Sequence, residues 1–113
     1  MRDFFQPGDI IIGETGTSGY GLGASRFPKD TYYITQTVYG SIGYATGAAV
    51  GAFETLKEDS KYKRGVLVTG EGSFHLTAQA VADMLRWELH PIVLVLILEL
   101  CLCKISNCSQ LSP

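Results

Sequence analysis

The stretch Gly65-Val66-Leu67-Val68-Thr69-Gly70-Glu71-Gly72-Ser73 combines three local signals that decide the fold. Its first part, residues 66–68, is a short apolar run with β-branched side chains, which predicts a buried strand. Gly70-Glu71-Gly72 predicts a tight turn that places one carboxylate between two glycines. Ser73 opens a new segment, because apolar residues recur at helical spacing over residues 74–88 and predict a helix.

Such a unit of strand, glycine turn and helix start offers the groups that bind a phosphate. The N–H groups at a helix start are free and lie at the positive end of the helix dipole. Glycines allow a ligand to approach the backbone closely. Glu71 adds a carboxylate, which Mg²⁺ prefers when it bridges a protein to substrate phosphates. From these residues alone, an ordinary turn with a solvated glutamate is the alternative.

Two further apolar runs predict buried strands. Residues 10–12 lead into the hydroxyl-rich segment Gly13-Glu14-Thr15-Gly16-Thr17-Ser18-Gly19, and residues 92–97 form the other run. Hydroxyls and exposed N–H groups suit phosphate oxygens, and ligands of parallel sheets lie outside the carboxyl ends of the strands. A loop with ordinary turn chemistry is the alternative for the hydroxyl-rich segment.

A helix is expected from residue 41 to about residue 56, with Ser41 as its N-cap. Gly43, Gly47 and Gly51 recur every four residues and share one helical face. We interpret this face as a surface that packs tightly on the sheet.

The segment between the first strand and this helix, residues 20–39, is expected to be a loop because glycines and Pro28 interrupt it. Its aromatic side chains are expected to cover the sheet edge. His75 and His90 are interpreted as surface or packed residues without a catalytic role. Helical crossovers between apolar strands predict an α/β fold in which a parallel sheet is flanked by helices on both faces.

Composition limits the classes of function. The 113 residues carry a formal net charge of -2, with 46% hydrophobic and 18% charged residues, which is typical of one globular domain. No cluster of Lys and Arg indicates a nucleic-acid surface. No signal peptide is visible, and the apolar run 92–98 is too short to cross a bilayer. We therefore expect a cytoplasmic protein with neither nucleic acid nor membrane as a partner.

All the cysteines, Cys101, Cys103 and Cys108, lie in the last part of the chain. Three thiols without a nearby histidine make a poor zinc site, so we interpret them as free thiols. The segment around them has no amphipathic period. We therefore divide the chain into a domain of residues 1–97 and an atypical tail of residues 98–113.

Three blocks in the domain resemble the fungal pyruvate decarboxylases, which belong to the thiamine diphosphate-dependent 2-oxo acid decarboxylases. The blocks are Gly13-Glu14-Thr15-Gly16-Thr17-Ser18, Tyr39-Gly40-Ser41-Ile42-Gly43-Tyr44 and Gly70-Glu71-Gly72-Ser73, followed by Leu76-Thr77 and Arg86-Trp87. Their order and spacing match that family over residues 4–97. The resemblance implies a truncated diphosphate-binding domain, with thiamine diphosphate and Mg²⁺ as cofactors and a 2-oxo acid as the substrate.

The resemblance also implies roles for the matched positions. Thr15 and Thr17 would contact the diphosphate. Gly40 would offer its carbonyl to the aminopyrimidine, and Ile42 would be the apolar wedge that bends the cofactor. Glu71 would bind Mg²⁺ in place of the usual aspartate. The remaining cofactor-binding positions in the blocks are Ser41, Gly70, Gly72 and Ser73.

The chain departs from the family in two ways. The asparagine pair that ends the family's motif would fall near Ile97 and Leu98, so the second metal ligand and the catalytic glutamate beyond it are missing. The N-terminal pyrimidine-binding domain is absent as well. We therefore assign no catalytic residue and expect a fragment of a decarboxylase that is inactive alone.

A non-catalytic interaction module, or a relic domain, is the alternative function. Such a module would pair with an intact subunit of the family's homo-oligomeric enzymes. The composition of the tail is typical of out-of-frame or intron-derived sequence. A genuine short protein with a new C-terminus is the other interpretation.

Overall fold

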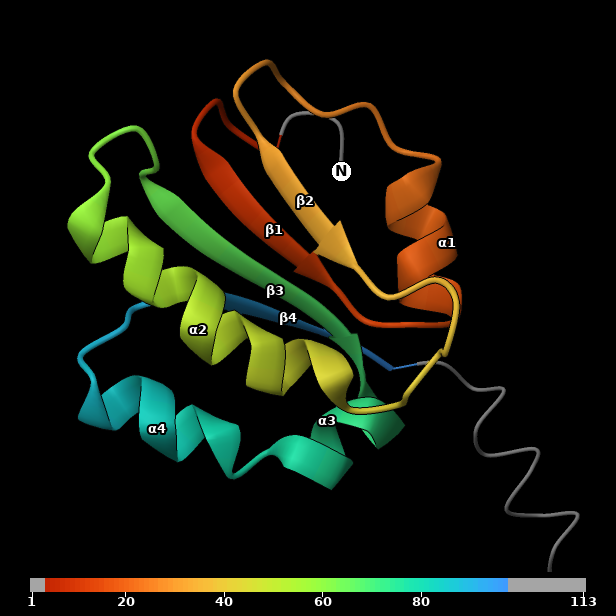
Figure 1. Cartoon of the computed structure of the whole chain (residues 1–113). Coiled ribbons are helices and arrows are strands. Elements are labelled where there is room, and N and C mark those ends of the chain that lie inside the picture. The colour runs from red at the N-terminus through yellow and green to blue at the C-terminus, as the bar shows by residue number, and fades with distance from the viewer. Residues whose placement is uncertain (1–3, 98–113) are drawn as a thin grey trace, which may run out of the picture.

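The sheet of this protein has four parallel strands in the order β2-β1-β3-β4 (Figure 1). The computed structural model describes residues 4–97, and its elements alternate along the chain as the α/β class requires. The elements are β1 (Asp9–Gly13), α1 (Thr17–Gly23), β2 (Tyr32–Thr35), α2 (Tyr44–Glu58), β3 (Arg64–Gly70), α3 (Glu71–Thr77), α4 (Ala80–Arg86) and β4 (Ile92–Leu96). The predicted fold class is therefore confirmed.

β1 is a central strand, because it pairs with β2 on one side and with β3 on the other. Ile11 lies in register with Tyr33 and with Val66, and Val66 in turn pairs with Ile92 of β4. All three pairings are parallel, since each connection returns the chain to the same end of the sheet. The strands expected at residues 10–12, 66–68 and 92–97 are confirmed.

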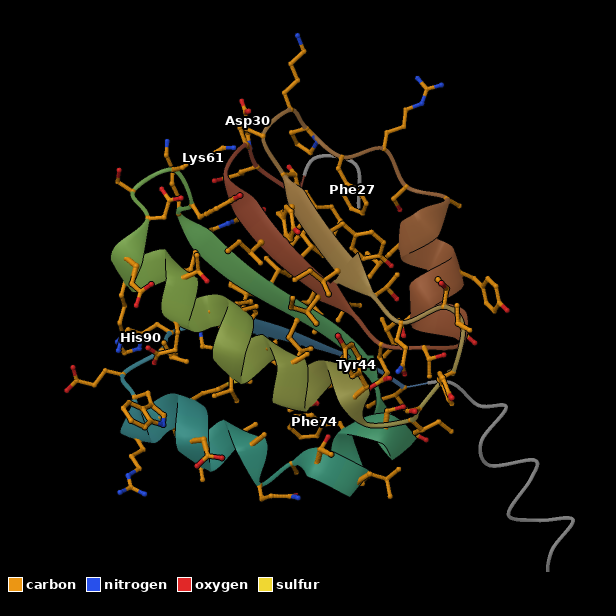
Figure 2. The ribbon with its side chains drawn as sticks, viewed as in Figure 1. Phe27, Asp30, Tyr44, Lys61, Phe74 and His90 are labelled. Atoms are coloured by element: carbon orange, nitrogen blue, oxygen red, sulfur yellow. The ribbon has the colours of Figure 1, made fainter. Side chains whose placement is uncertain are left out.

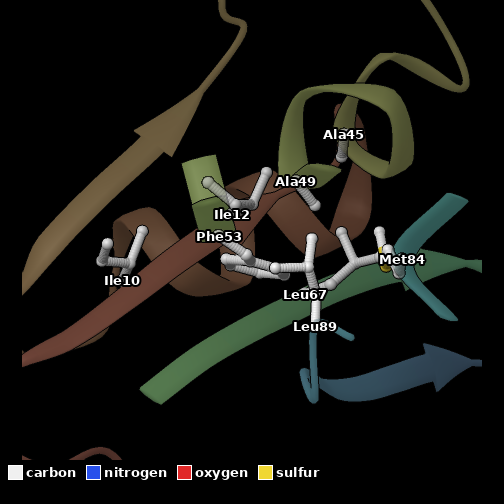
Figure 3. Close-up of a cluster of buried hydrophobic side chains, with 8 residues drawn as sticks. All are labelled: Ile10, Ile12, Ala45, Ala49, Phe53, Leu67, Met84 and Leu89. Carbon is white, nitrogen blue, oxygen red and sulfur yellow. The ribbon is translucent and has the colours of Figure 1, made fainter. Parts of the chain in front are cut away.

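One face of the sheet packs against α2 and α4, which lie side by side in Figure 1. Successive side chains of a strand point to opposite faces, so Ile10 and Ile12 share this face. Phe53 of α2 lies directly on the backbone of Gly65, because a Cβ atom built there would be 2.6 Å from its ring. Figure 3 shows the buried cluster, which consists of Ile10, Ile12, Ala45, Ala49, Phe53, Leu67, Met84 and Leu89.

The opposite face of the sheet is covered by α1 and by the chain before β1. Ile11 and Val68 point to this face, where Leu22 of α1 and Phe5 complete a second buried cluster with Val66. Phe27 extends this cluster through an edge contact with Phe5, at a centroid distance of 5.2 Å. Helices on both faces therefore confirm the predicted layers.

The expectation of a loop over residues 20–39 is wrong in two places and holds for residues 24–31 and 36–39. α1 occupies the segment up to Gly23, and β2 forms the edge of the sheet at Tyr32–Thr35. α1 contains three glycines, so its helix propensity is low and its place in the fold depends on the burial of Leu22.

The single helix expected over residues 74–88 is in fact two helices. α3 ends at Thr77 and α4 begins at Ala80. α3 also starts earlier than expected, at Glu71, so Gly70 is the N-cap and Gly72 lies within the first helical turn. The glycine segment is therefore a direct passage from strand to helix.

The N-terminal part of α2 differs from the expectation in two respects. Its N-cap is Gly43, with a left-handed φ of 93°, and not Ser41. Gly47 and Gly51 are exposed, with no atom within 4 Å of an added Cβ, so the predicted packing of these glycines on the sheet is wrong. Ala45, Ala49 and Phe53 face the sheet instead.

No helix within residues 4–97 is both long enough and apolar enough to cross a membrane. The expected free thiols, Cys101, Cys103 and Cys108, lie outside the described residues.

Candidate cofactor-binding site

A cavity of about 400 Å³ lies at the carboxyl ends of the strands. Four segments that are distant in sequence meet there: the turn after β1, the loop before α2, the passage from β3 into α3, and the end of β4 (Figure 1). The cavity is lined by Thr15, Thr17, Ser18, Ile42, Gly70, Glu71, Gly72, Ser73, Leu76 and Leu96. This is the end of a parallel sheet at which ligands bind.

The cavity has a polar wall and an apolar wall. Hydroxyl groups come from the turn after β1 and from Ser73, and Glu71 is the acidic residue among the lining side chains. Ile42, Leu76 and Leu96 form the apolar part. Ile42 and Leu76 are 61% and 60% exposed, so apolar surface is available to a ligand at the opening. This arrangement suits a molecule with one anionic end and one apolar ring.

The structure brings most of the sequence-assigned residues to one place. Thr15, Thr17, Ile42 and the four residues Gly70-Glu71-Gly72-Ser73 line the same cavity. Gly40 does not line it, but a Cβ atom built on Gly40 would be 3.4 Å from the Thr15 hydroxyl oxygen. Its left-handed φ of 59° and this close approach both favour glycine.

Ser41 is the assigned residue whose side chain has no visible part in the cavity. It is exposed, and its backbone N–H donates to Oε1 of Gln36 at 2.7 Å. This bond fixes the loop between β2 and α2 without using the serine hydroxyl.

Glu14 is a buried residue that sequence reasoning did not assign to the site. Its Oε1 accepts the N–H of Thr15 at 2.9 Å, and its Oε2 accepts the N–H groups of Gly43 at 3.1 Å and Ala45 at 3.2 Å. The sequence contains one signal for this residue, because Glu14 is a charged residue that comes almost directly after the apolar run of residues 10–12. Ser18, which lines the cavity and donates to the Glu14 carbonyl oxygen at 3.1 Å, was also unassigned.

Gly43 connects the loop before α2 to α3. Its carbonyl oxygen accepts the Thr77 hydroxyl at 2.9 Å, and an added Cβ would be 3.0 Å from the methyl carbon of Thr77. The turn after β1 is fixed to β3 by the Glu14 N–H, which donates to the Val68 carbonyl at 2.8 Å. The segments around the cavity are therefore joined mainly through backbone groups.

Among the described residues, no cationic side chain lines the cavity. No group of three or more His, Cys, Asp or Glu side chains is assembled within residues 4–97. His75 and His90 are exposed, and Figure 2 shows His90 well separated from Tyr44, at the start of α2, and from Phe74 of α3. An anion in this cavity would depend on hydroxyls, backbone N–H groups and a bound cation.

Comparison with known proteins agrees with this geometry. Residues 10–99 match the family described as "Thiamine pyrophosphate enzyme, C-terminal TPP binding domain". The chain is 48% identical over 96 residues to a pyruvate decarboxylase of Hanseniaspora uvarum and to pyruvate decarboxylase isozyme 3 of Saccharomyces cerevisiae. It is 46% identical over 88 residues to a pyruvate decarboxylase of Candida albicans.

The matched segments cover 85% of this chain in the first two cases and 78% in the third. They cover only 17%, 17% and 16% of the relatives themselves. The family match includes every residue that lines the cavity. The chain therefore belongs to the thiamine pyrophosphate enzyme family, and residues 10–99 correspond to its C-terminal TPP-binding domain.

Proposed function

We propose that this chain binds the diphosphate of thiamine diphosphate, with Mg²⁺, as a part of a decarboxylase that acts on pyruvate or a related 2-oxo acid. The observation that carries the proposal is the single cavity in which residues from three separate sequence blocks meet. Relatives with similar sequence are named pyruvate decarboxylases, which supports the substrate class.

The polar wall fits a diphosphate. Thr15, Thr17 and Ser73 supply hydroxyl donors, and Gly70 and Gly72 leave the backbone accessible to phosphate oxygens. These donors are neutral, so they orient the anion but do not neutralise it. A cation must do that, and no lysine or arginine from the described part of the chain lines the cavity.

Glu71 is the residue that would hold the cation. Mg²⁺ takes near-octahedral oxygen ligands and usually combines one or two carboxylates with phosphate oxygens and waters. Ile97, near which the family's asparagine pair would fall, has no oxygen donor in its side chain and is 78% exposed. The residues present therefore fit the diphosphate well and the metal in part.

The apolar wall has a different role from the polar one. Ile42 would support the bent cofactor, and Leu76 and Leu96 would exclude water from its ring. When bound, the cofactor would supply the nucleophilic and electron-accepting chemistry that decarboxylation of a 2-oxo acid requires. Among residues 4–97, no acid or base other than Glu71 lines the cavity, so we expect the chain alone to release no carbon dioxide from pyruvate.

A titration with thiamine diphosphate tests the proposal. We expect Mg²⁺-dependent binding in the millimolar range, which corresponds to about -4 kcal/mol. Glu71→Ala should abolish this binding, because it removes the carboxylate that lines the cavity. Glu58→Ala, an exposed change at the other end of α2, is the matched control and should bind as the unmodified chain does.

Two binding results would contradict this assignment, and one activity result would contradict the expected inactivity. Absence of binding by the unmodified chain would remove the proposed function. Binding that Glu71→Ala leaves unchanged would show that the metal is held elsewhere. Carbon dioxide release above a blank, from a preparation free of host decarboxylase, would contradict the expected inactivity.

A second candidate function is a non-catalytic module that pairs with an intact decarboxylase subunit. Val38 and Tyr39, in the loop before α2, are 91% and 88% exposed beside the cavity segments. Large apolar side chains that are exposed together favour a protein partner. Co-elution of the chain with a purified decarboxylase in gel filtration tests this candidate, and separate elution would reject it.

A further inference from the structure

Glu14 is fully buried at the end of β1, yet its side chain does not line the cavity. We infer that Glu14 is a positioning residue, whose carboxylate holds the loop that carries Gly40 and Ile42 against the turn that carries Thr15. The inference rests on the proposed function, because it says how the shape of the cofactor cavity is maintained.

The two oxygens of Glu14 serve different segments. Oε1 accepts the N–H of Thr15 in its own turn, at 2.9 Å. Oε2 accepts the N–H groups of Gly43 and Ala45 at 3.1 and 3.2 Å, from residues 29 and 31 positions later in the chain. One carboxylate therefore joins two of the three sequence blocks that form the cavity. Hydrogen bonds to an ionised acceptor are stronger than neutral ones, which suits this bridging role.

The loop before α2 depends on this carboxylate because it accepts the two buried N–H groups at the junction of the loop with the helix. The N-cap of α2 is a glycine and makes no side-chain capping bond. Ser41, which the sequence suggested as the cap, instead uses its N–H to bond Gln36. The buried N–H groups of Gly43 and Ala45 are satisfied by Glu14, and a buried donor that loses its acceptor destabilises its surroundings. Ile42 directly precedes Gly43, so its position depends on the same bonds.

A carboxylate is the group that this place requires. Glutamine has the same length but only one acceptor oxygen, and its NH₂ group would face an N–H donor on one side or the other. Aspartate keeps both oxygens but is one methylene shorter. Glu14→Gln should therefore break one of the two connections, and Glu14→Asp should lengthen them.

Asp9, the first residue of β1, provides a matched control for Glu14, which directly follows the strand. It is equally buried, but it lies at the amino end of β1 and pairs with Arg64, and it does not line the cavity. Asp9→Asn is expected to lower stability without changing the loop before α2. The comparison separates loss of positioning from loss of stability.

The test combines ligand binding with amide hydrogen exchange in the full chain. At a thiamine diphosphate concentration, with Mg²⁺, that half-saturates the unmodified chain, Glu14→Gln should be only about a tenth occupied, the effect of a roughly tenfold weaker Kd. Asp9→Asn should remain half-saturated. Without ligand, Glu14→Gln should raise the exchange rates of the Gly43 and Ala45 amides about tenfold relative to that of Phe53 in the same helix.

Each outcome decides between the alternatives. Unchanged binding and unchanged exchange in a folded Glu14→Gln chain would overturn the inference. If the unmodified chain does not bind, the proposed function fails, and the exchange rates alone then judge whether Glu14 holds the loop. If neither Glu14→Gln nor Glu14→Asp folds while Asp9→Asn does, Glu14 serves the fold and not the cavity, which also overturns the inference.

Discussion

A buried carboxylate lies at each end of β1, and the two carboxylates are stabilised by different kinds of partner. At the amino end, Asp9 pairs with the Arg64 guanidinium of β3 through contacts of 2.6 and 2.8 Å. At the carboxyl end, Glu14 accepts only backbone N–H groups. The first arrangement joins two strands by a pair of opposite charges. The second joins two loops and brings no cationic side chain toward the cavity.

Because of this difference, the residues at the amino end of β1 serve stability, whereas those at its carboxyl end shape the cavity. A side-chain ion pair fixes strand positions and is satisfied without a ligand. Around the cavity, the lining within the described residues contains a carboxylate and hydroxyls but no positive side chain, so an anion bound there would need a cation beside it. We therefore expect changes at the amino end to affect unfolding, and changes at the carboxyl end to affect binding.

The largest expected effect is on stability, from Arg64→Met. Asp9 is buried and the Arg64 side chain is 27% exposed, so this change leaves a buried carboxylate without its cation, and about 3 kcal/mol, the value for a fully buried pair, is the upper limit of the loss. Urea unfolding followed by circular dichroism measures the loss. Cofactor binding by the folded fraction should be unchanged, and a matching loss of affinity would show that the two ends are coupled.

The same ion pair should resist alkaline conditions. The hydrogen bond with Asp9 raises the pKa of the Arg64 guanidinium above its ordinary value. A raised pKa means that the contribution of this cation is complete below the unfolded pKa and is lost only as pH rises through the folded one. The pair should therefore survive throughout the pH range in which the fold is stable.

A smaller effect on stability is expected from Gly65→Ala, near the amino end of β3. The added Cβ would lie 2.6 to 2.8 Å from three ring atoms of the buried Phe53, so the core must shift at a cost of about 2 kcal/mol. Gly47→Ala is the matched control, because its added methyl meets no atom within 4 Å and improves helix propensity. Thermal unfolding should show a lower Tm for the first variant and an unchanged or higher Tm for the second.

The smallest effect on stability is expected from Gly43→Ala. This change should nevertheless weaken cofactor binding. The left-handed φ of 93° costs a non-glycine residue about 1 kcal/mol or more, and the methyl would press on Thr77. Because Gly43 donates to Glu14, this strain should reach the loop before α2. A titration that shows unchanged affinity would break the proposed link between this loop and the cavity.

The strands could be predicted from the sequence where apolar residues alone determine their place. Residues 10–12 and 66–68 each form a buried run on one of the two central strands, and burial on both faces leaves the hydrophobic signal uninterrupted. β2 carries a weaker signal, since Tyr32 is exposed and only one side of this strand is paired among the described residues. α1 could not be predicted from propensity, because packing of Leu22 overrides its glycines.

The candidate site shows a similar limit. Thr15, Ile42 and Glu71 lie in blocks whose composition suggests a ligand, and the structure places all three around one cavity. Glu14 lies in the same block as Thr15, but it is an acidic residue, and the local sequence predicts that an acidic residue after a strand is exposed to solvent. Its burial follows from N–H groups that arrive 29 and 31 residues later, and no local pattern contains that information.

The pairing of β1 with β3 has a consequence for the order of folding. It joins positions 55 residues apart, a greater separation than in the other two strand pairs, and closing so long a loop costs entropy before any contact repays it. Residues 70–73, which form one wall of the cavity, follow β3 directly. The cavity therefore exists only in molecules that have completed this pairing. A ligand that fills it draws newly made chains toward the finished fold by mass action.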